Sequence, residues 1–171
     1  MHSLDEELMA LALAEAKQGL AVNEVPIGAV AALDGDALAS AHWRLRPHFR
    51  LLDHPEVLVL RAAEVRRLTG PDRARVTLYT TLEPCLLCMG AAMSFMAGRI
   101  VFALEAPLDG ASDVADAWQP VFGYPTDGFP YAVPEVVGGV RRQYSLALMQ
   151  EFVSTHPESR WASALLPPSA G

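Results

Sequence analysis

The spacing of apolar positions along this 171-residue chain changes several times, and each change predicts a different element. Residues 3–6, Ser-Leu-Asp-Glu, have the form of a capping box. Apolar residues then recur at helical spacing up to Gly19, which predicts a first helix. Two short apolar runs, 25–33 and 37–42, flank Asp34-Gly35-Asp36, which is a strong turn signal. They predict a β-hairpin.

The middle of the chain alternates between helical and extended patterns. Residues 43–52 have no period and predict a loop, after which Asp53 is a candidate helix cap. Apolar spacing from Glu56 predicts a helix that ends at Gly70-Pro71. Strands are then expected at 76–80 and 99–104, on either side of an almost wholly apolar and therefore buried helix, 86–97. This order predicts a layered α/β domain in which helices pack on a sheet.

The last third of the chain differs in character. Residues 107–134 contain five prolines and several aromatic residues, and a loop of this length in a compact domain is usually functional. We expect an ordered loop on the substrate side, then a last helix over about 141–155. The predicted organisation is one domain, 1–156, and a C-terminal tail, 157–171, frayed after Trp161.

Composition restricts the partners and the compartment. A chain that is 51% hydrophobic and 171 residues long suits one well-buried domain. Its formal net charge of -7 predicts that the field of the whole molecule repels nucleic acid. No apolar run approaches the roughly 18 residues of a membrane span, and the first residues are acidic where a signal peptide would be basic. We therefore expect a cytoplasmic protein with no membrane partner.

The two cysteines of the chain, Cys85 and Cys88, stand three positions apart. Taken alone, such a pair also suits a redox-active dithiol or half of a structural zinc knuckle. With His54 the cysteines supply the three ligands of a catalytic Zn²⁺ site, which leaves the fourth position to water. A helix that opens at Pro84 would place both sulfurs on one face, and His54 would begin a second helix whose N-terminal dipole favours thiolates.

Glu56 lies two residues after His54 and is not needed as a ligand. Zinc lowers the pKa of bound water to about 7. Hydrolysis at an aromatic amidine carbon also requires one proton for the ring nitrogen and another for the departing amine. A single carboxylate beside the water carries both, so the sequence predicts Glu56 as the catalytic acid and base.

These residues carry a family resemblance. His54-x-Glu56 followed by Pro84-Cys85-x-x-Cys88 resembles the signature of the cytidine and deoxycytidylate deaminase superfamily. Residues 24–30, 81–91 and 98–102 are most similar to bacterial tRNA-adenosine deaminases and related nucleobase or nucleoside deaminases. The resemblance implies Zn²⁺ on His54, Cys85 and Cys88, and Glu56 as the acid and base. It also implies a three-layer α/β/α fold with a mixed five-stranded sheet, and a homodimer.

The chain departs from the tRNA-adenosine enzymes at several points. It has His42-Trp43-Arg44 where they carry Trp-Asn-Arg, so the asparagine expected to contact the base is missing, and Asn23 is the sole asparagine of the chain. The C-terminal end is apolar where theirs is basic. Together with the acidic charge, these departures favour a small substrate. The leading hypothesis is a zinc-dependent hydrolytic deaminase of a free nucleobase, nucleoside or related amino-heterocycle.

Two alternatives remain open from the sequence. One is a tRNA-specific adenosine deaminase that converts A to I at the anticodon. The other is a non-catalytic, zinc-stabilised binding subunit, although the presence of Glu56 argues against it. For either enzyme, the candidate substrate contacts lie after the hairpin and in the 107–134 loop, and they are Trp43, Asn23, Asp109, Asp113 and Trp118.

Overall fold

The computed structural model describes residues 3–45, 48–114, 117 and 131–165, and in this part of the chain five strands form one sheet of order β2-β1-β3-β4-β5. β1 (Gly28–Leu33) pairs antiparallel with both β2 (Asp36–His42) and β3 (Val76–Leu82). β3 pairs parallel with β4 (Arg99–Leu104), which pairs parallel with β5 (Glu135–Val137). The predicted mixed five-stranded sheet is confirmed.

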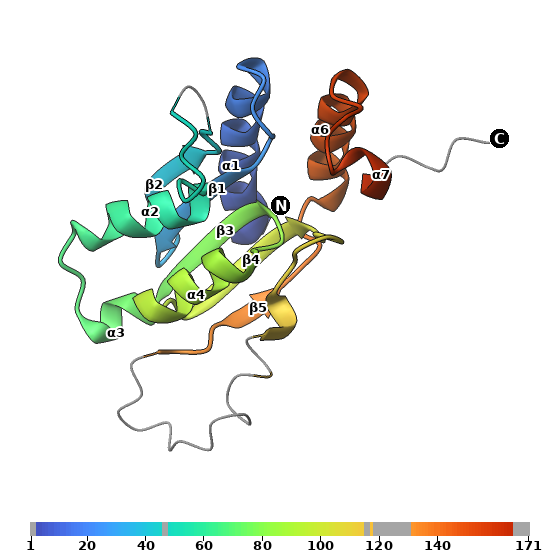
Figure 1. The fold of residues 1–171 in the computed structure, drawn as a ribbon. Coiled ribbons are helices and arrows are strands. Elements are labelled where there is room, and N and C mark those ends of the chain that lie inside the picture. Colours follow the sequence, from blue (N-terminus) through green and yellow to red (C-terminus); the bar gives the residue numbers. More distant parts are fainter. Residues whose placement is uncertain (1–2, 46–47, 115–116, 118–130, 166–171) are drawn as a thin grey trace.

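Helices cover both faces of this sheet (Figure 1). α1 (Leu4–Ala21) and α6 (Arg142–Thr155) lie on one face, whereas α2 (Pro55–Glu64) and α4 (Leu86–Phe95) lie on the other. Successive residues of β1 are buried on opposite sides, because Val30 packs against α1 while Ala31 belongs to the cluster that includes α2 and α4. A strand buried on both faces is typical of the central layer of a three-layer α/β/α fold, and this prediction is confirmed.

α1 packs directly against the backbone of β1 at Gly28. The predicted capping box is present, with Glu6 N–H donating to Ser3 Oγ and Ser3 N–H donating to the Glu6 carboxylate. Gly28 makes the close approach possible, since a Cβ there would lie 2.1 Å from the carbonyl oxygen of Ala12. The connection from α1 to β1 is thereby held at one end of the sheet.

The second helix is shorter than the sequence predicts. α2 ends at Glu64, and Arg67 takes a left-handed φ of 53° before a separate helix, α3 (Gly70–Arg73). The physical reason is a second capping box: Thr69 Oγ1 accepts from Asp72 N–H, and Asp72 in turn accepts from Thr69 N–H. Gly70-Pro71 therefore begins a helix where the sequence predicted an end.

The helix after β3 also differs from its prediction. It begins at Leu86 with Cys85 as the N-cap, because Pro84 lies in an extended segment whose carbonyl accepts from Ala111 N–H. The prediction that this helix is buried is wrong for its first turn, since Leu86 is 66% exposed and Leu87 is 38% exposed. One end of α4 therefore presents an apolar surface to solvent.

The chain beyond α6 folds back onto the domain. Trp161 is 4% exposed and packs with Met149 and Phe152, and a short helix, α7 (Ala162–Leu165), follows it. The prediction that the chain frays immediately after Trp161 is therefore wrong for residues 162–165. They form a helix next to the buried Trp161 indole. The division into 1–156 and 157–171 stays a prediction. Most of the predicted 107–134 loop, including Trp118, lies outside the described residues.

None of the helices in the described part of the chain is long and apolar enough to cross a membrane.

Candidate active site

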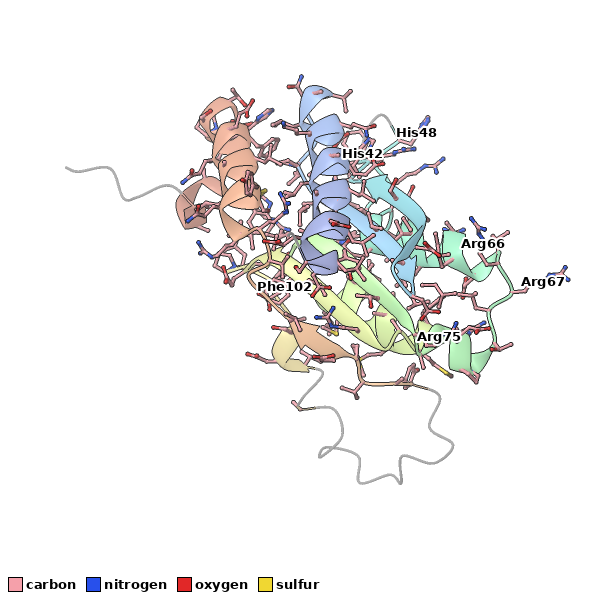
Figure 2. All side chains as sticks on the ribbon, turned by 180° about the vertical axis from the view of Figure 1, so that it is seen from behind. His42, His48, Arg66, Arg67, Arg75 and Phe102 are labelled. Atoms are coloured by element: carbon pink, nitrogen blue, oxygen red, sulfur yellow. The ribbon has the colours of Figure 1, made fainter. Side chains whose placement is uncertain are left out.

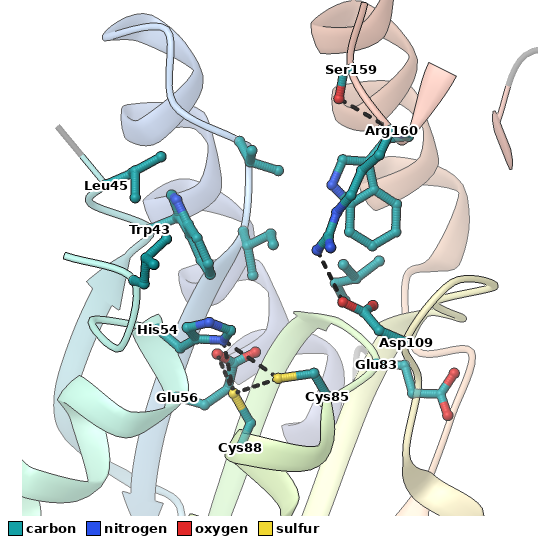
Figure 3. A pocket seen from close by; sticks show the side chains of 15 residues that line it. Trp43, Leu45, His54, Glu56, Glu83, Cys85, Cys88, Asp109, Ser159 and Arg160 are labelled. Carbon is teal, nitrogen blue, oxygen red and sulfur yellow. Dashed lines mark hydrogen bonds and ion pairs between the residues drawn. The ribbon is translucent and has the colours of Figure 1, made fainter. Parts of the chain in front are cut away.

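The starts of α2 and α4 meet above one end of β3 and bring the predicted residues together (Figure 3). His54 is the N-cap of α2, with Pro55 in the first helical position, and Glu56 follows it. Cys85 is the N-cap of α4, and Cys88 lies in the first turn. Both helices therefore direct their positive N-terminal ends at the same place.

The three candidate ligands fit one zinc ion. His54 Nδ1 lies 3.5 Å from Cys85 Sγ and 3.3 Å from Cys88 Sγ, and the two sulfurs are 3.6 Å apart. Atoms bound tetrahedrally to one zinc at about 2.0–2.3 Å lie roughly 3.3–3.8 Å from one another. Three ligands leave one position free, as in catalytic zinc sites.

The cysteine environment favours a thiolate. A hydrogen bond with Cys88, followed by one with His54, lowers the pKa of Cys85 to about 3. The pKa of Cys88 is raised, first by its hydrogen bond with Cys85 and then by burial. Burial acts to lower the pKa of His54, but the hydrogen bond and negative charge of Cys85 outweigh it and raise that pKa. Cys85 is therefore a thiolate at neutral pH, and a metal that binds here would displace the proton of Cys88.

Glu56 lies beside the candidate ligands in a dry environment. Its side chain is 3% exposed, and burial raises the pKa of its carboxyl group. Thr80 Oγ1 donates to Glu56 Oε1 at 2.7 Å, and Glu56 Oε2 accepts from Cys88 Sγ at 3.3 Å. A buried carboxyl group with a raised pKa takes up a proton more readily than an exposed one, which suits an acid and base.

A cavity of about 450 Å³ opens above these groups. Trp43 and Leu45 form one wall, and Ser159 and Arg160 lie across from them (Figure 3). Trp161 also lines the cavity. The indole of Trp43 meets the His54 imidazole edge to face, with ring centroids 4.3 Å apart. The volume falls within the range of small-molecule sites and is sufficient for one heterocyclic base.

The structure places some predicted substrate contacts at this cavity and others elsewhere. Trp43 and Asp109 line it. Asn23 is exposed in a left-handed turn after α1, and Asp113 is exposed, and neither is among the described residues of the lining. Trp118 lies outside the described residues.

Sequence reasoning missed the C-terminal wall of the cavity. Arg160 donates to Asp109 at 3.0 Å, and its guanidinium stacks over the Trp161 ring at 5.0 Å from the centroid. Trp161, an isolated large aromatic residue after the last helix, was a usable signal that the segment packs onto the domain. The sequence contains no comparable signal for Arg160, because its partner is 51 positions away.

Glu83 holds the segment that carries Asp109. Its carboxylate accepts from Ala106 N–H at 3.0 Å, from Ser112 N–H at 3.3 Å and from the Ser112 hydroxyl. Gly110 packs so closely that a Cβ there would meet Glu83 Oε2 at 2.4 Å. Glu83 thus fixes one side of the cavity mouth.

This fold, with a His/Cys/Cys group and a carboxylate at two helix starts, defines a zinc-dependent hydrolytic enzyme. The model of the cytidine and deoxycytidylate deaminase zinc-binding region matches residues 2–104. The chain belongs to this family and is a zinc-dependent deaminase.

Several of the similar proteins are described as tRNA adenosine deaminases. The chain is 38% identical over 112 residues to a tRNA-specific adenosine deaminase of Bacillus subtilis, covering 63% of this chain and 66% of the relative. It is 33% identical over 148 residues to the tRNA-specific adenosine deaminase of Agrobacterium fabrum, and the match covers 84% of this chain and 90% of the relative. A solved structure from a study of A-to-I editing by tRNA:A34 deaminases at the wobble position superposes with a TM-score of 0.66 at 33% identity. The match covers 83% of this chain and 98% of that structure's chain.

These findings contradict the leading hypothesis of a free nucleobase or nucleoside substrate. The two relatives and the solved structure named above are described as acting on tRNA, at 33% to 38% identity. The prediction failed because it rested on the net charge of the whole chain, one missing asparagine and the apolar C-terminal end. At physiological salt, charges more than about 8 Å apart in solvent are largely screened, so the net charge says little about the cavity mouth.

Proposed function

We propose that this protein is a tRNA-specific adenosine deaminase that converts an adenosine of an anticodon to inosine and releases ammonia. The observation that carries the proposal is the similarity to tRNA-specific adenosine deaminases, which reaches 84% of this chain and 90% of one relative. The site supports it, since the His/Cys/Cys group and Glu56 line a cavity of the size of a base.

The proposed chemistry divides between the metal and the protein. His54, Cys85 and Cys88 would hold zinc, which when bound supplies an activated water at neutral pH. Glu56 accepts one proton from the attacking water and delivers it to the ring nitrogen, then accepts the second proton from the hydroxyl group added at C6 and delivers it to the departing amine. At C6 of adenine a C–O bond forms, the exocyclic C–N bond breaks and ammonia leaves.

The cavity requires the base to leave its stack, because the reactive groups lie below the surface. Trp43 and Trp161 both line the cavity and offer aromatic and apolar contact to an extruded base. Arg160 lies at the mouth, where the sugar and phosphates of the same nucleotide would remain. An exposed guanidinium there suits a phosphate oxygen, so we assign the tRNA contact to this edge.

We further propose that two copies associate through α4. The exposed Leu86 and Leu87 adjoin an apolar groove of about 390 Å³. Its other described lining residues are mostly apolar, namely Met89, Gly90, Ala91, Met93, Ser94, Val114 and Tyr131. A second copy of the chain is the occupant that would bury this surface symmetrically.

The test uses purified, zinc-loaded protein and an RNA anticodon stem-loop with adenosine at the wobble position. Nucleoside analysis by mass spectrometry should show inosine and an equal amount of ammonia. Free adenosine, cytosine and guanine serve as competing substrates and should react far more slowly. Stoichiometric zinc without inosine formation would overturn the proposal.

A further inference from the structure

A buried hydroxyl group lies under the candidate acid and base. Thr80 is 0% exposed in β3, where its neighbours across the sheet are Ala29 in β1 and Phe102 in β4. Its side chain points to the face covered by α2 and α4, like that of Leu78 two residues earlier. A buried hydroxyl is costly unless it is hydrogen-bonded, and Thr80 Oγ1 donates to Glu56 Oε1 at 2.7 Å.

This hydrogen bond joins the reactive carboxylate to a rigid element. Glu56 belongs to α2, whereas Thr80 belongs to the middle strand of the sheet. With Oε1 held by Thr80, Oε2 lies 3.3 Å from Cys88 Sγ, at the edge of the ligand group. The two oxygens therefore have different neighbours, and the terminal torsion of the glutamate is fixed.

We propose that Thr80 is a positioning residue for the deaminase reaction. Its hydroxyl holds Oε1 of Glu56 so that Oε2 faces the reacting groups. This inference rests on the proposed function, in which Glu56 transfers protons. Reactive groups must be held within about 0.5 Å of their productive positions, and a displacement of about 1 Å can cost 100-fold in rate.

Threonine suits this position better than serine. Its β-branched side chain is restricted at χ1, so the hydroxyl direction is fixed by the strand backbone. Serine keeps the hydroxyl but loses the methyl group that limits its rotation. Valine keeps the shape and loses the hydrogen bond. The three residues therefore separate hydroxyl chemistry from packing.

Thr81 provides a matched control in the same strand. It is also 0% exposed, but its Oγ1 accepts from Gly28 N–H at 3.0 Å and does not contact Glu56. Thr80→Val and Thr81→Val each remove one buried hydroxyl group. A purely structural role for both residues predicts similar losses of melting temperature and no specific loss of turnover.

The kinetic test compares these variants on the anticodon stem-loop. Thr80→Val should lower kcat by about 10- to 100-fold while the KM changes by less than about two-fold, with zinc still bound at one ion per chain. Thr80→Ser should recover most of the lost kcat, and Thr81→Val should keep wild-type kcat at a temperature where it is folded. Wild-type turnover in Thr80→Val, or no recovery in Thr80→Ser, would overturn the inference.

A second measurement does not depend on the substrate. Crystal structures of the zinc-loaded wild type and of Thr80→Val should show one Glu56 carboxylate position in the wild type, and a rotated or divided position in the variant. Identical Glu56 positions would refute the role of Thr80. If wild-type protein made no inosine, the proposed function would fail, and the two crystal structures would still decide whether Thr80 positions Glu56.

Discussion

Two glutamates at the cavity have different surroundings and therefore different roles. Glu56 is buried beside the candidate ligands, and burial raises the pKa of its carboxyl group. Glu83 accepts two backbone N–H groups and the Ser112 hydroxyl, and it thereby fixes the segment that carries Asp109. Under the proposed mechanism, environment separates a proton-transferring carboxyl group, that of Glu56, from a structural one.

Replacement of Glu56 by glutamine should remove turnover and leave the metal in place. The amide has nearly the shape of the carboxylate but cannot relay protons, so we expect kcat to fall by about 10²- to 10⁴-fold. Inosine formation and elemental analysis for zinc measure the two effects. Glu64→Gln, on the exposed face of the same helix, is the control and should retain full activity. An active Glu56→Gln enzyme would contradict the assignment.

Arg160 should contribute to RNA binding through a phosphate. Arg160→Ala should raise the KM for the stem-loop and reduce the slope of log affinity against log salt by about 1. Arg75→Ala is a matched control, because Arg75 also forms an exposed ion pair, with Asp34, at the end of the molecule where α3 lies (Figure 2). Equal salt slopes for the two variants would exclude the contact.

At the scale of single residues, the sequence predicts which side chains meet only where those residues are close together in the chain. His54-x-Glu56 and Cys85-x-x-Cys88 each fall within one helix start, so spacing alone places their side chains together. The pairing of Thr80 with Glu56 and of Asp109 with Arg160 depends on distances between separate elements. Those pairs follow from tertiary packing, which no short pattern encodes.

Among the elements, the first turn of α1 is tied to the sheet by charge. Asp5 accepts two hydrogen bonds from Arg99 of β4, at 2.7 and 2.9 Å, and one from Tyr79 of β3 at 2.8 Å. The hydrogen bond to Arg99 is the largest cause that lowers the pKa of Asp5. Burial, together with Asp5, raises the pKa of Tyr79 to about 12. One carboxylate thus joins α1 to two strands.

The contribution of Asp5 to stability should disappear in acid. Because its folded pKa lies below the unfolded value of about 3.9, the contribution is complete above that pH and is lost as the pH falls through the folded pKa. Asp5→Asn should therefore unfold more easily than wild type at pH 7, by about 1 kcal/mol, and this difference should shrink as the pH falls through the folded pKa of Asp5. Urea unfolding at several pH values measures this.

The control for that series is Asp36→Asn, an exposed position in β2. It should match wild type throughout the pH range. If the difference in free energy of unfolding between Asp5→Asn and wild type stayed constant down to pH 2, the charge of Asp5 would not contribute to stability. The hydrogen-bond geometry alone would then explain the difference.

Predictions of elements succeeded where capping and periodicity agreed. The Ser3–Glu6 capping box marked the start of α1 correctly. The Thr69–Asp72 box was hidden beside Gly70-Pro71, which is also a common stop signal, and so α3 was missed. β5 has three residues, exposed or half-buried, and its strand character comes from pairing with β4. A strand this short contains too few alternating apolar positions to be predicted from the sequence.

For the whole molecule, the distribution of charge matters more than its sum. Arg66, Arg67 and Arg75 project from the end where α2 finishes and α3 lies, away from the helix start that carries His54 (Figure 2). The layered architecture followed from the order of elements in the sequence. The order and direction of the strands did not, because long connections leave several pairings open.

Association of two copies should depend on the exposed face of α4. Size-exclusion chromatography with light scattering should give the wild-type protein a mass of twice the 18.4 kDa of one chain. Gly90→Arg should be a folded monomer, because a Cβ at Gly90 meets no atom within 4 Å whereas a charged side chain would enter the groove. Gly70→Arg in α3, another position with open space, should remain dimeric. A monomeric wild type would refute the interface.

The two walls of the cavity are far apart in the chain, and this has a consequence for biosynthesis. A growing chain presents His54, Glu56 and both cysteines to the cell well before Ser159, Arg160 and Trp161 leave the ribosome. The candidate zinc ligands are therefore synthesised before this wall of the cavity. The cavity has its full lining only after the segment that carries these three residues has packed onto the domain.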